Sequence, residues 1–295
     1  MPKGPIAFQI CLLLAALPIA VNAQLIYGTA YISDGEASSL YTLDPTNGQA
    51  SFVGPIGFTR VSGITINRNN GILYGVGRSD GIQSLITINR STGAGSAVGA
   101  VGFTNNVTDM AFRQSDQKLY GIDRRSGQIV TFDEGTGAAS VVATISALGS
   151  GSALAFSNSG KLYYAHDGTL DEIDPSDGSL VTTVTLDFAG VGLNSDSPRI
   201  NGMDFDPSTD TLWGSFAQGG DSSNPNDYIN HLFTIDPLTG SVVKIGLTIQ
   251  GLESVAVATA IPEPSLTALL ATGIALSVFG SRMGRYRRGR REHGN

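Results

Sequence analysis

Cysteine is almost absent from this 295-residue chain, because Cys11 is the only one and it lies in the apolar N-terminal stretch. The remainder of the chain therefore offers no disulfide, no cysteine nucleophile and no thiolate metal site. A chain of this length can fold around a hydrophobic core without disulfides. The missing cysteines thus exclude a class of chemistry rather than a stable fold.

Basic residues are scarce in the middle of the chain. Of the 18 lysines and arginines, 7 are Lys3 and six C-terminal arginines, and 18 less 7 leaves 11 in residues 24–260. That span holds 23 acidic residues, the total of 25 less Glu263 and Glu292, so its net charge is 11 less 23, or −12. Such a body repels phosphates, so nucleic acid is not an expected partner.

Sequence motifs for catalysis and metal binding are also lacking. G-x-S-x-G and D-x-D-x-D-G do not occur, and His166 and His231 stand in no metal-binding motif. The loops around Asp196 and at 221–227 carry the oxygen ligands that Ca²⁺ prefers. Because every turn aspartate also has a local hydrogen bond to make, we expect no metal and no cofactor, with Ca²⁺ as the weaker alternative.

The N-terminus has the three parts of a secretory signal peptide, residues 1–23. Lys3 precedes an apolar stretch at 6–19, and small residues lead up to Ala23. We expect cleavage between Ala23 and Gln24. An uncleaved membrane anchor is the alternative, and it is less favoured because Pro18 interrupts a short stretch.

A repeated hairpin organises residues 24–260. In each copy an Asp or Asn precedes a Gly by four residues, between flanks that alternate apolar and polar side chains. The Asx side chain can accept a backbone N–H two residues on, and Gly supplies the left-handed conformation that closes the turn. This pattern predicts a tight β-hairpin in every copy. The copies begin at Leu40, Leu85, Ile129, Leu170 and Leu232.

Two further strands complete each repeat. One carries a single aromatic residue (Tyr74, Tyr120, Tyr163 or Trp213), and an apolar strand precedes it. Four strands in about 45 residues is the size of a propeller blade.

The ends of residues 24–260 supply two halves of one repeat. Residues 24–31 contain an aromatic strand with Tyr27, and 251–260 contain an inner strand with no aromatic strand after it. The sequence therefore predicts an all-β, five-bladed β-propeller with a composite closing blade. A solenoid is the alternative, but it would need capping repeats.

Polar residues stand at the starts of the predicted inner strands: Ser62, Thr108, Asp109, Ser152, Asn201 and Glu253. A polysaccharide hydrolase or lyase would need paired carboxylates, which Asp109, Asp204 and Glu253 could supply. The competing interpretation is that these groups solvate a narrow channel. Since nothing in the sequence sets their mutual distances, we expect no enzyme.

The C-terminus is organised as a processing and anchoring segment, residues 261–291. Pro262 and Pro264 keep Glu263 in an extended stretch. Residues 265–280 carry no charge, and with Ser281 they predict a transmembrane helix over 265–281. The basic cluster after it would stay cytoplasmic under the positive-inside rule. That cluster comprises Arg282, Arg285, Arg287, Arg288, Arg290 and Arg291.

The order of Pro-Glu-Pro, apolar helix and arginine tail resembles the PEP-CTERM sorting signal of exported bacterial proteins. The resemblance covers residues 261–291 and implies cleavage near 262–264 by an exosortase-type membrane protease. The body resembles, more loosely, other exported bacterial propellers with L-Y-x-I-D-P-x-T-G repeats.

Together these features predict a protein that is anchored in the inner membrane and then processed to the cell surface or extracellular matrix. Its expected role is structural, adhesive or exopolysaccharide-binding, with surface glycans as partners. The alternatives are the hydrolase or lyase above and an unprocessed type I membrane protein.

Overall fold

The structure is a computed structural model that describes residues 24–31, 35–102, 107–146, 148–149, 151, 153–193, 199–218 and 229–258. The predicted signal peptide, the Pro-Glu-Pro motif, the helix over 265–281 and the arginine tail lie outside the described residues. None of the helices in the described ranges has the length and apolar character needed to span a membrane.

The described residues form β-strands and one short 3₁₀ segment, which confirms the all-β prediction. In chain order they are β1 (Leu25–Ala30), β2 (Ala37–Leu43), β3 (Ala50–Ile66), β4 (Leu73–Ser79), β5 (Ile82–Ile88), β6 (Gly95–Ala100), β7 (Val107–Arg113), β8 (Lys118–Asp123), β9 (Gln128–Phe132), β10 (Ala139–Thr144), β11 (Ala153–Phe156), β12 (Leu162–His166), β13 (Thr169–Ile173), β14 (Leu180–Thr185), η1 (Ala189–Val191), β15 (Arg199–Phe205), β16 (Leu212–Gln218), β17 (Ile229–Ile235), β18 (Val242–Leu247) and β19 (Leu252–Ala258).

These strands pair antiparallel in four sheets. Three sheets have four strands each, β7 to β10, β11 to β14 and β15 to β18, with neighbours in chain order. The remaining sheet has seven strands in the order β19-β1-β2-β3-β4-β5-β6. The first half of β3 pairs with β2 and its second half with β4. The long strand β3 is therefore the outer strand of one four-stranded group and the inner strand of the next.

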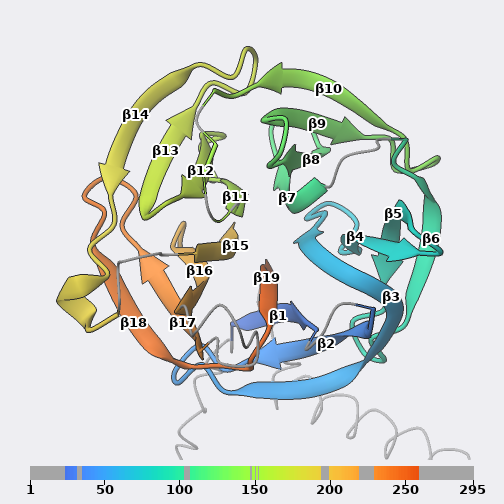
Figure 1. The fold of residues 1–295 in the computed structure, drawn as a ribbon, viewed down its shortest axis with the longest axis horizontal. Helices are drawn as coiled ribbons and strands as arrows, with labels where there is room; N and C mark the ends of the chain where they lie inside the picture. The colour runs from blue at the N-terminus through green and yellow to red at the C-terminus, as the bar shows by residue number, and fades with distance from the viewer. Residues whose placement is uncertain are drawn as a thin grey trace, which may run out of the picture. The chain divides into compact units, whose positions relative to one another are not determined.

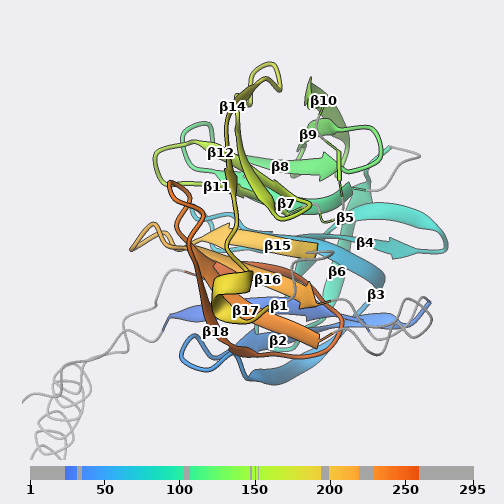
Figure 2. The same cartoon turned by 60° about the vertical axis from the view of Figure 1, so that its left-hand side comes forward.

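The four-stranded groups are arranged around a ring (Figure 1). The inner strands β19, β3, β7, β11 and β15 contact one another in this cyclic order, and β15 contacts β19. In Figure 1, β6, β10, β14 and β18 lie at the rim. Figure 2 turns one side forward, so that β14 and β18 cross in front of the other strands of their sheets. The pairing of β1 with β19, Leu25 opposite Ala258, joins the two ends of this unit.

The repeated turns have the predicted hydrogen bonds. In the first copy the Thr46 N–H donates to Asp44 Oδ1 over 2.8 Å, and Gly48 has φ 80°. The equivalent bonds in the other copies join Ser91 to Asn89, Gly135 to Asp133, Ser176 to Asp174 and Leu238 to Asp236. The hairpin prediction is confirmed because a local side-chain bond and a left-handed glycine define each turn.

The aromatic residues form one equivalent position in each group and are buried in the core. Each is paired across the sheet with a small or polar inner-strand residue, for example Tyr120 with Ala111 and Trp213 with Asp204. This register brings equivalent positions of all inner strands to one level of the ring axis, and it thereby positions the site described next.

Candidate functional site

Backbone irregularities at the start of the inner strands aim polar side chains toward the ring axis. Thr108, Asn201 and Glu253 are each an extra residue between two paired neighbours, in β7, β15 and β19. In β3 the three residues 60–62 face a single residue of β4. A bulge of this kind redirects the side chain of the unpaired residue, and bulges are common beside binding sites.

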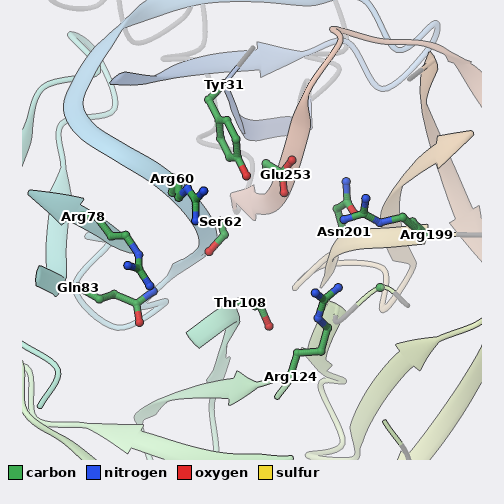
Figure 3. A pocket seen from close by; sticks show the side chains of 11 residues that line it. Tyr31, Arg60, Ser62, Arg78, Gln83, Thr108, Arg124, Arg199, Asn201 and Glu253 are labelled. Carbon is green, nitrogen blue, oxygen red and sulfur yellow. The ribbon is translucent and has the colours of Figure 1, made fainter. Parts of the chain in front are cut away.

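Arg60 lies in the β3 bulge with a φ of 50°, a left-handed conformation that is unusual for a residue other than glycine. Strained backbone of this type persists where the surrounding structure holds it and is concentrated at functional sites. The side chain of Arg60 lines a pocket of about 140 Å³ (Figure 3).

Arginines dominate the lining of this pocket. Figure 3 shows Arg60 and Arg78 on one side and Arg124 and Arg199 on the other. The remaining lining residues are Tyr31, Ser62, Gln83, Thr108, Gly151, Asn201 and Glu253.

The pocket is therefore positive inside an acidic body. It collects 4 of the 11 basic residues of 24–260, and Glu253 is the carboxylate among its described lining residues. The arginine side chains are half-buried. In a partly desolvated cleft such charges act on a ligand more strongly than on an open surface.

Hydrogen bonds to the backbone hold the pocket walls in place. Gln83 binds Val107 with both ends of its amide, since Nε2 donates to the Val107 carbonyl and Oε1 accepts its N–H, each over 2.9 Å. Thr108 Oγ1 donates to the Ile122 carbonyl over 3.1 Å. Asn201 Nδ2 donates to the Leu252 carbonyl over 3.2 Å. A site built on fixed strands in this way is pre-organised for its ligand.

Asp109, the residue after Thr108, is bonded to two of the other inner strands. Its side chain is fully buried, and Oδ2 accepts the Leu154 N–H over 2.8 Å while Oδ1 accepts Ser254 Oγ over 2.9 Å. Burial raises the pKa of Asp109 well above its usual range, and these hydrogen bonds oppose that shift.

Ser254 links β3 to this cluster, because its Oγ accepts the Ile64 N–H over 3.1 Å. One carboxylate and one hydroxyl thus connect β3, β7, β11 and β19. We call Asp109 and Ser254 the hub. Glycines let the strands approach there: a Cβ on Gly63 would lie 2.7 Å from Asp109 Cα, and one on Gly202 would lie 2.5 Å from Ser254 Cα.

Asp204 lies further along the inner strands, towards their C-terminal ends. Its Oδ2 accepts the Val257 N–H over 2.9 Å, and its Oδ1 is 3.4 Å from Arg68 Nη2. Arg68 Nη2 also donates to the Phe205 carbonyl over 2.6 Å. Burial raises the pKa of Asp204 to about 6, and the Arg68 charge limits the rise.

The three predicted carboxylates therefore have different surroundings. Glu253 lines the pocket, Asp109 is in the hub below it, and Asp204 is bound to Arg68 and Val257. Of the predicted ring of polar residues, Ser62, Thr108, Asn201 and Glu253 do line one pocket. Ser152 lies outside the described residues.

The four pocket arginines were not predicted from the sequence, although the repeat carries a signal for them. Arg60 and Arg199 each stand two residues before the polar residue of their inner strand. Arg78 and Arg124 each stand four residues after the aromatic residue of their strand, as does Tyr31. Aligning the repeats beyond the hairpin would have found both sets of equivalent positions.

No group of three or more potential metal-binding side chains occurs among His, Cys, Asp and Glu of the described ranges. The loops that carry Asp196 and residues 221–227, the alternative Ca²⁺ sites of the sequence analysis, lie outside those ranges.

No protein-family model matches this sequence, and no curated protein matches it. Among solved structures, the chain is similar to one in a nidogen/laminin complex, with 12% identity over 81% of this chain and 99% of that one, and a TM-score of 0.50. The fold is a β-propeller. This confirms the predicted architecture at the level of the fold alone.

Two Bacteroides chains show weaker similarity to this propeller. A protein of unknown function from Bacteroides thetaiotaomicron VPI-5482 is 15% identical, with a TM-score of 0.48 over 75% of this chain and 57% of that one. A Bacteroides fragilis NCTC 9343 chain provisionally named 6-phosphogluconolactonase is 11% identical, with a TM-score of 0.47 over 82% and 99% of the two chains. Neither bears on function.

Proposed function

We propose that this chain is an exported, non-enzymatic, five-bladed β-propeller that binds an acidic polysaccharide of the cell surface or extracellular matrix. The five blades are the three four-stranded sheets and the two four-stranded groups that share β3, of which β19-β1-β2-β3 is the composite closing blade. The observation that carries the binding function is the convergence of four arginines on one axial pocket in an acidic body.

The chemistry of the lining suits a sugar acid. Arginine presents a planar fork of N–H donors that binds a carboxylate through two parallel hydrogen bonds. Tyr31, Ser62, Thr108, Asn201 and Glu253 add groups that can exchange hydrogen bonds with sugar hydroxyls. The walls are already fixed by bonds to the backbone, so little ordering accompanies binding.

The test compares two adjacent arginines in the full chain. Arg124 lines the pocket, whereas Arg125 is exposed and lies outside it. In calorimetric titration with oligogalacturonates, Arg124→Gln should weaken binding by about tenfold or more, because a charge-assisted bond is lost. Arg125→Gln should bind like the wild type. Equal affinities for all three proteins would refute binding at this pocket.

We also propose that the propeller is delivered by its flanking segments, with the signal peptide directing export and an exosortase-type protease cutting near 262–264. The structure makes this compatible with an intact propeller, because β19 ends at Ala258. Intact mass of the protein from cells should lack residues 1–23 and 265–295. A mass that retains 265–295 would instead support an unprocessed type I membrane protein.

The geometry supports binding better than hydrolysis or eliminative cleavage of a polysaccharide. Paired carboxylates must face the scissile bond from within the site, and Glu253 is the carboxylate among the described residues that line this pocket. Incubating the wild type with oligogalacturonates should release no new reducing ends or unsaturated products. Product formation that disappears in Glu253→Gln would establish the enzyme instead.

A further inference from the structure

We infer that the pocket recognises the terminal sugar of an acidic polysaccharide, a single hexuronate, rather than an internal stretch of the chain. This inference rests on the proposed function, because it assumes that the arginine pocket binds a sugar acid. It adds the binding mode and the unit that is recognised.

The first argument is that the pocket is closed at its inner end. Glu253 and Thr108 line it, and the residues that follow them, Ser254 and Asp109, are the hub and are both fully buried. The hub connects four of the inner strands by hydrogen bonds, and β15 packs against it at Gly202. The backbones at Gly63 and Gly202 have no room for even a methyl group. A polysaccharide therefore cannot thread through the ring, and a ligand enters and leaves by the same opening.

The second argument is size. The pocket has a volume of about 140 Å³. An engineered protein cavity of about 150 Å³ holds one benzene molecule, so a volume of this order accommodates one six-membered ring. One pyranose unit fills such a space, and a second unit must lie outside it.

The third argument is the charge of the lining. Four arginines favour an anion, while Glu253 in the same pocket disfavours a doubly charged one. Glu253 can instead accept hydrogen bonds from hydroxyl groups, of which a hexuronate has several. Tyr31 lies beside Glu253 on that wall (Figure 3). The arrangement fits one carboxylate on a polyhydroxylated ring.

The fourth argument is the rim. Glu36 precedes β2 and Asp80 follows β4 at the end of the strands where the pocket opens, and both are exposed. Uronates further along a polyanionic chain would meet these like charges and a body with a net charge of −12, the 11 basic less the 23 acidic residues of 24–260. Extra units therefore add little binding free energy once the terminal one is bound.

The experiment is calorimetric titration of the full chain with oligogalacturonates of increasing length, from the monomer upward, at constant ionic strength. We expect one protein per oligosaccharide and an affinity per chain that stays within about threefold from the shortest binding oligomer onward. Partial hydrolysis of a long polymer, at constant uronate concentration, should raise its binding capacity in proportion to the number of chain ends.

Several results would overturn this inference. Affinity that climbs steadily with length, or several proteins bound per long chain, would show internal binding and leave the proposed function standing. Inorganic phosphate or sulfate competing as strongly as the monomeric uronate would show a simple anion site. Arg124→Gln and Arg125→Gln, run in parallel, separate these cases from failure of the proposed function, in which no oligomer distinguishes Arg124→Gln from the wild type.

Discussion

Arginines at the two ends of the ring axis have opposite surroundings. At one end, Arg68 bonds to the Phe205 carbonyl over 2.6 Å and Asn158 Oδ1 over 3.0 Å and pairs with Asp204. At the other, Arg78 and Arg124 line a pocket and form no ion pair with a carboxylate of the described residues. An arginine therefore has a structural role where buried acceptors surround it. Where they do not, an arginine is available to a ligand.

The carboxylates show the same division. Asp109 and Asp204 are buried and bonded to backbone N–H groups, whereas Glu253 lies half-buried in the pocket. Burial and backbone donors mark a structural role, and a position at the surface of a polar pocket marks a binding role. The predictions that follow test this division, from the largest effect to the smallest.

A substitution in the hub should reduce the stability of the fold most. Asp109→Leu removes the acceptor for Leu154 N–H and Ser254 Oγ and leaves these buried donors without a partner. We expect a loss of about 3–5 kcal/mol in the free energy of unfolding. Urea denaturation measures it, with Asp80→Asn at an exposed turn as the control. A loss of stability no greater than that of the control would show that the hub has no structural role.

Arg68→Met should cause the second largest loss of stability. It leaves the buried Asp204 carboxylate and the Phe205 carbonyl without their arginine partner. The expected loss is about 2–4 kcal/mol, because an uncompensated buried charge remains. A variant that also removes that charge, Arg68→Met with Asp204→Asn, should recover part of the stability in a double-mutant cycle.

Asp204 should make stability depend on pH. Its pKa is about 6 in the folded protein, against a usual 3.8, so folding takes up a proton in this interval. The contribution of Asp204 to stability is complete below the lower value and is lost as pH rises through about 6. Relative to Asp204→Asn, the wild type should gain about 1–3 kcal/mol between pH 7 and pH 4. A difference between the two proteins that does not change with pH would contradict the raised pKa.

Arg78→Met should have the smallest effect on stability. Because Arg78 pairs with no described carboxylate, we expect a change of at most about 0.5 kcal/mol in the free energy of unfolding. Uronate binding by the same protein should nevertheless fall by about tenfold or more. A stability loss equal to that of Arg68→Met would contradict the claim that the arginines at the two ends of the axis have different roles.

Local chemistry made much of the fold predictable. Each turn combines an Asx side chain with a glycine four residues later, as in Asp44 and Gly48, and both interactions form within one short segment. The aromatic residue was equally predictable from the sequence, because it occupies the same position in every repeat. Such features depend on neighbours in the chain, so sequence patterns report them directly.

The candidate site was only partly predictable. The repeat predicts the polar positions Ser62, Thr108, Asn201 and Glu253, but it does not distinguish Asp109 from them. Thr108 and Asp109 are adjacent, and the β7 bulge decides that the first faces the pocket and the second the hub. No pattern in one repeat specifies a bulge, because it arises where β7 and β8 pair.

The sequence by itself determined the strands, the turns and their repetition, since these rest on hydrogen bonds and side-chain alternation within one repeat. The tertiary structure alone decided that Arg60, Arg78, Arg124 and Arg199 share one pocket and that Asp109 is buried in the hub. Those residues come from different repeats, and only closure of the ring through the pairing of β1 with β19 brings them around a common axis.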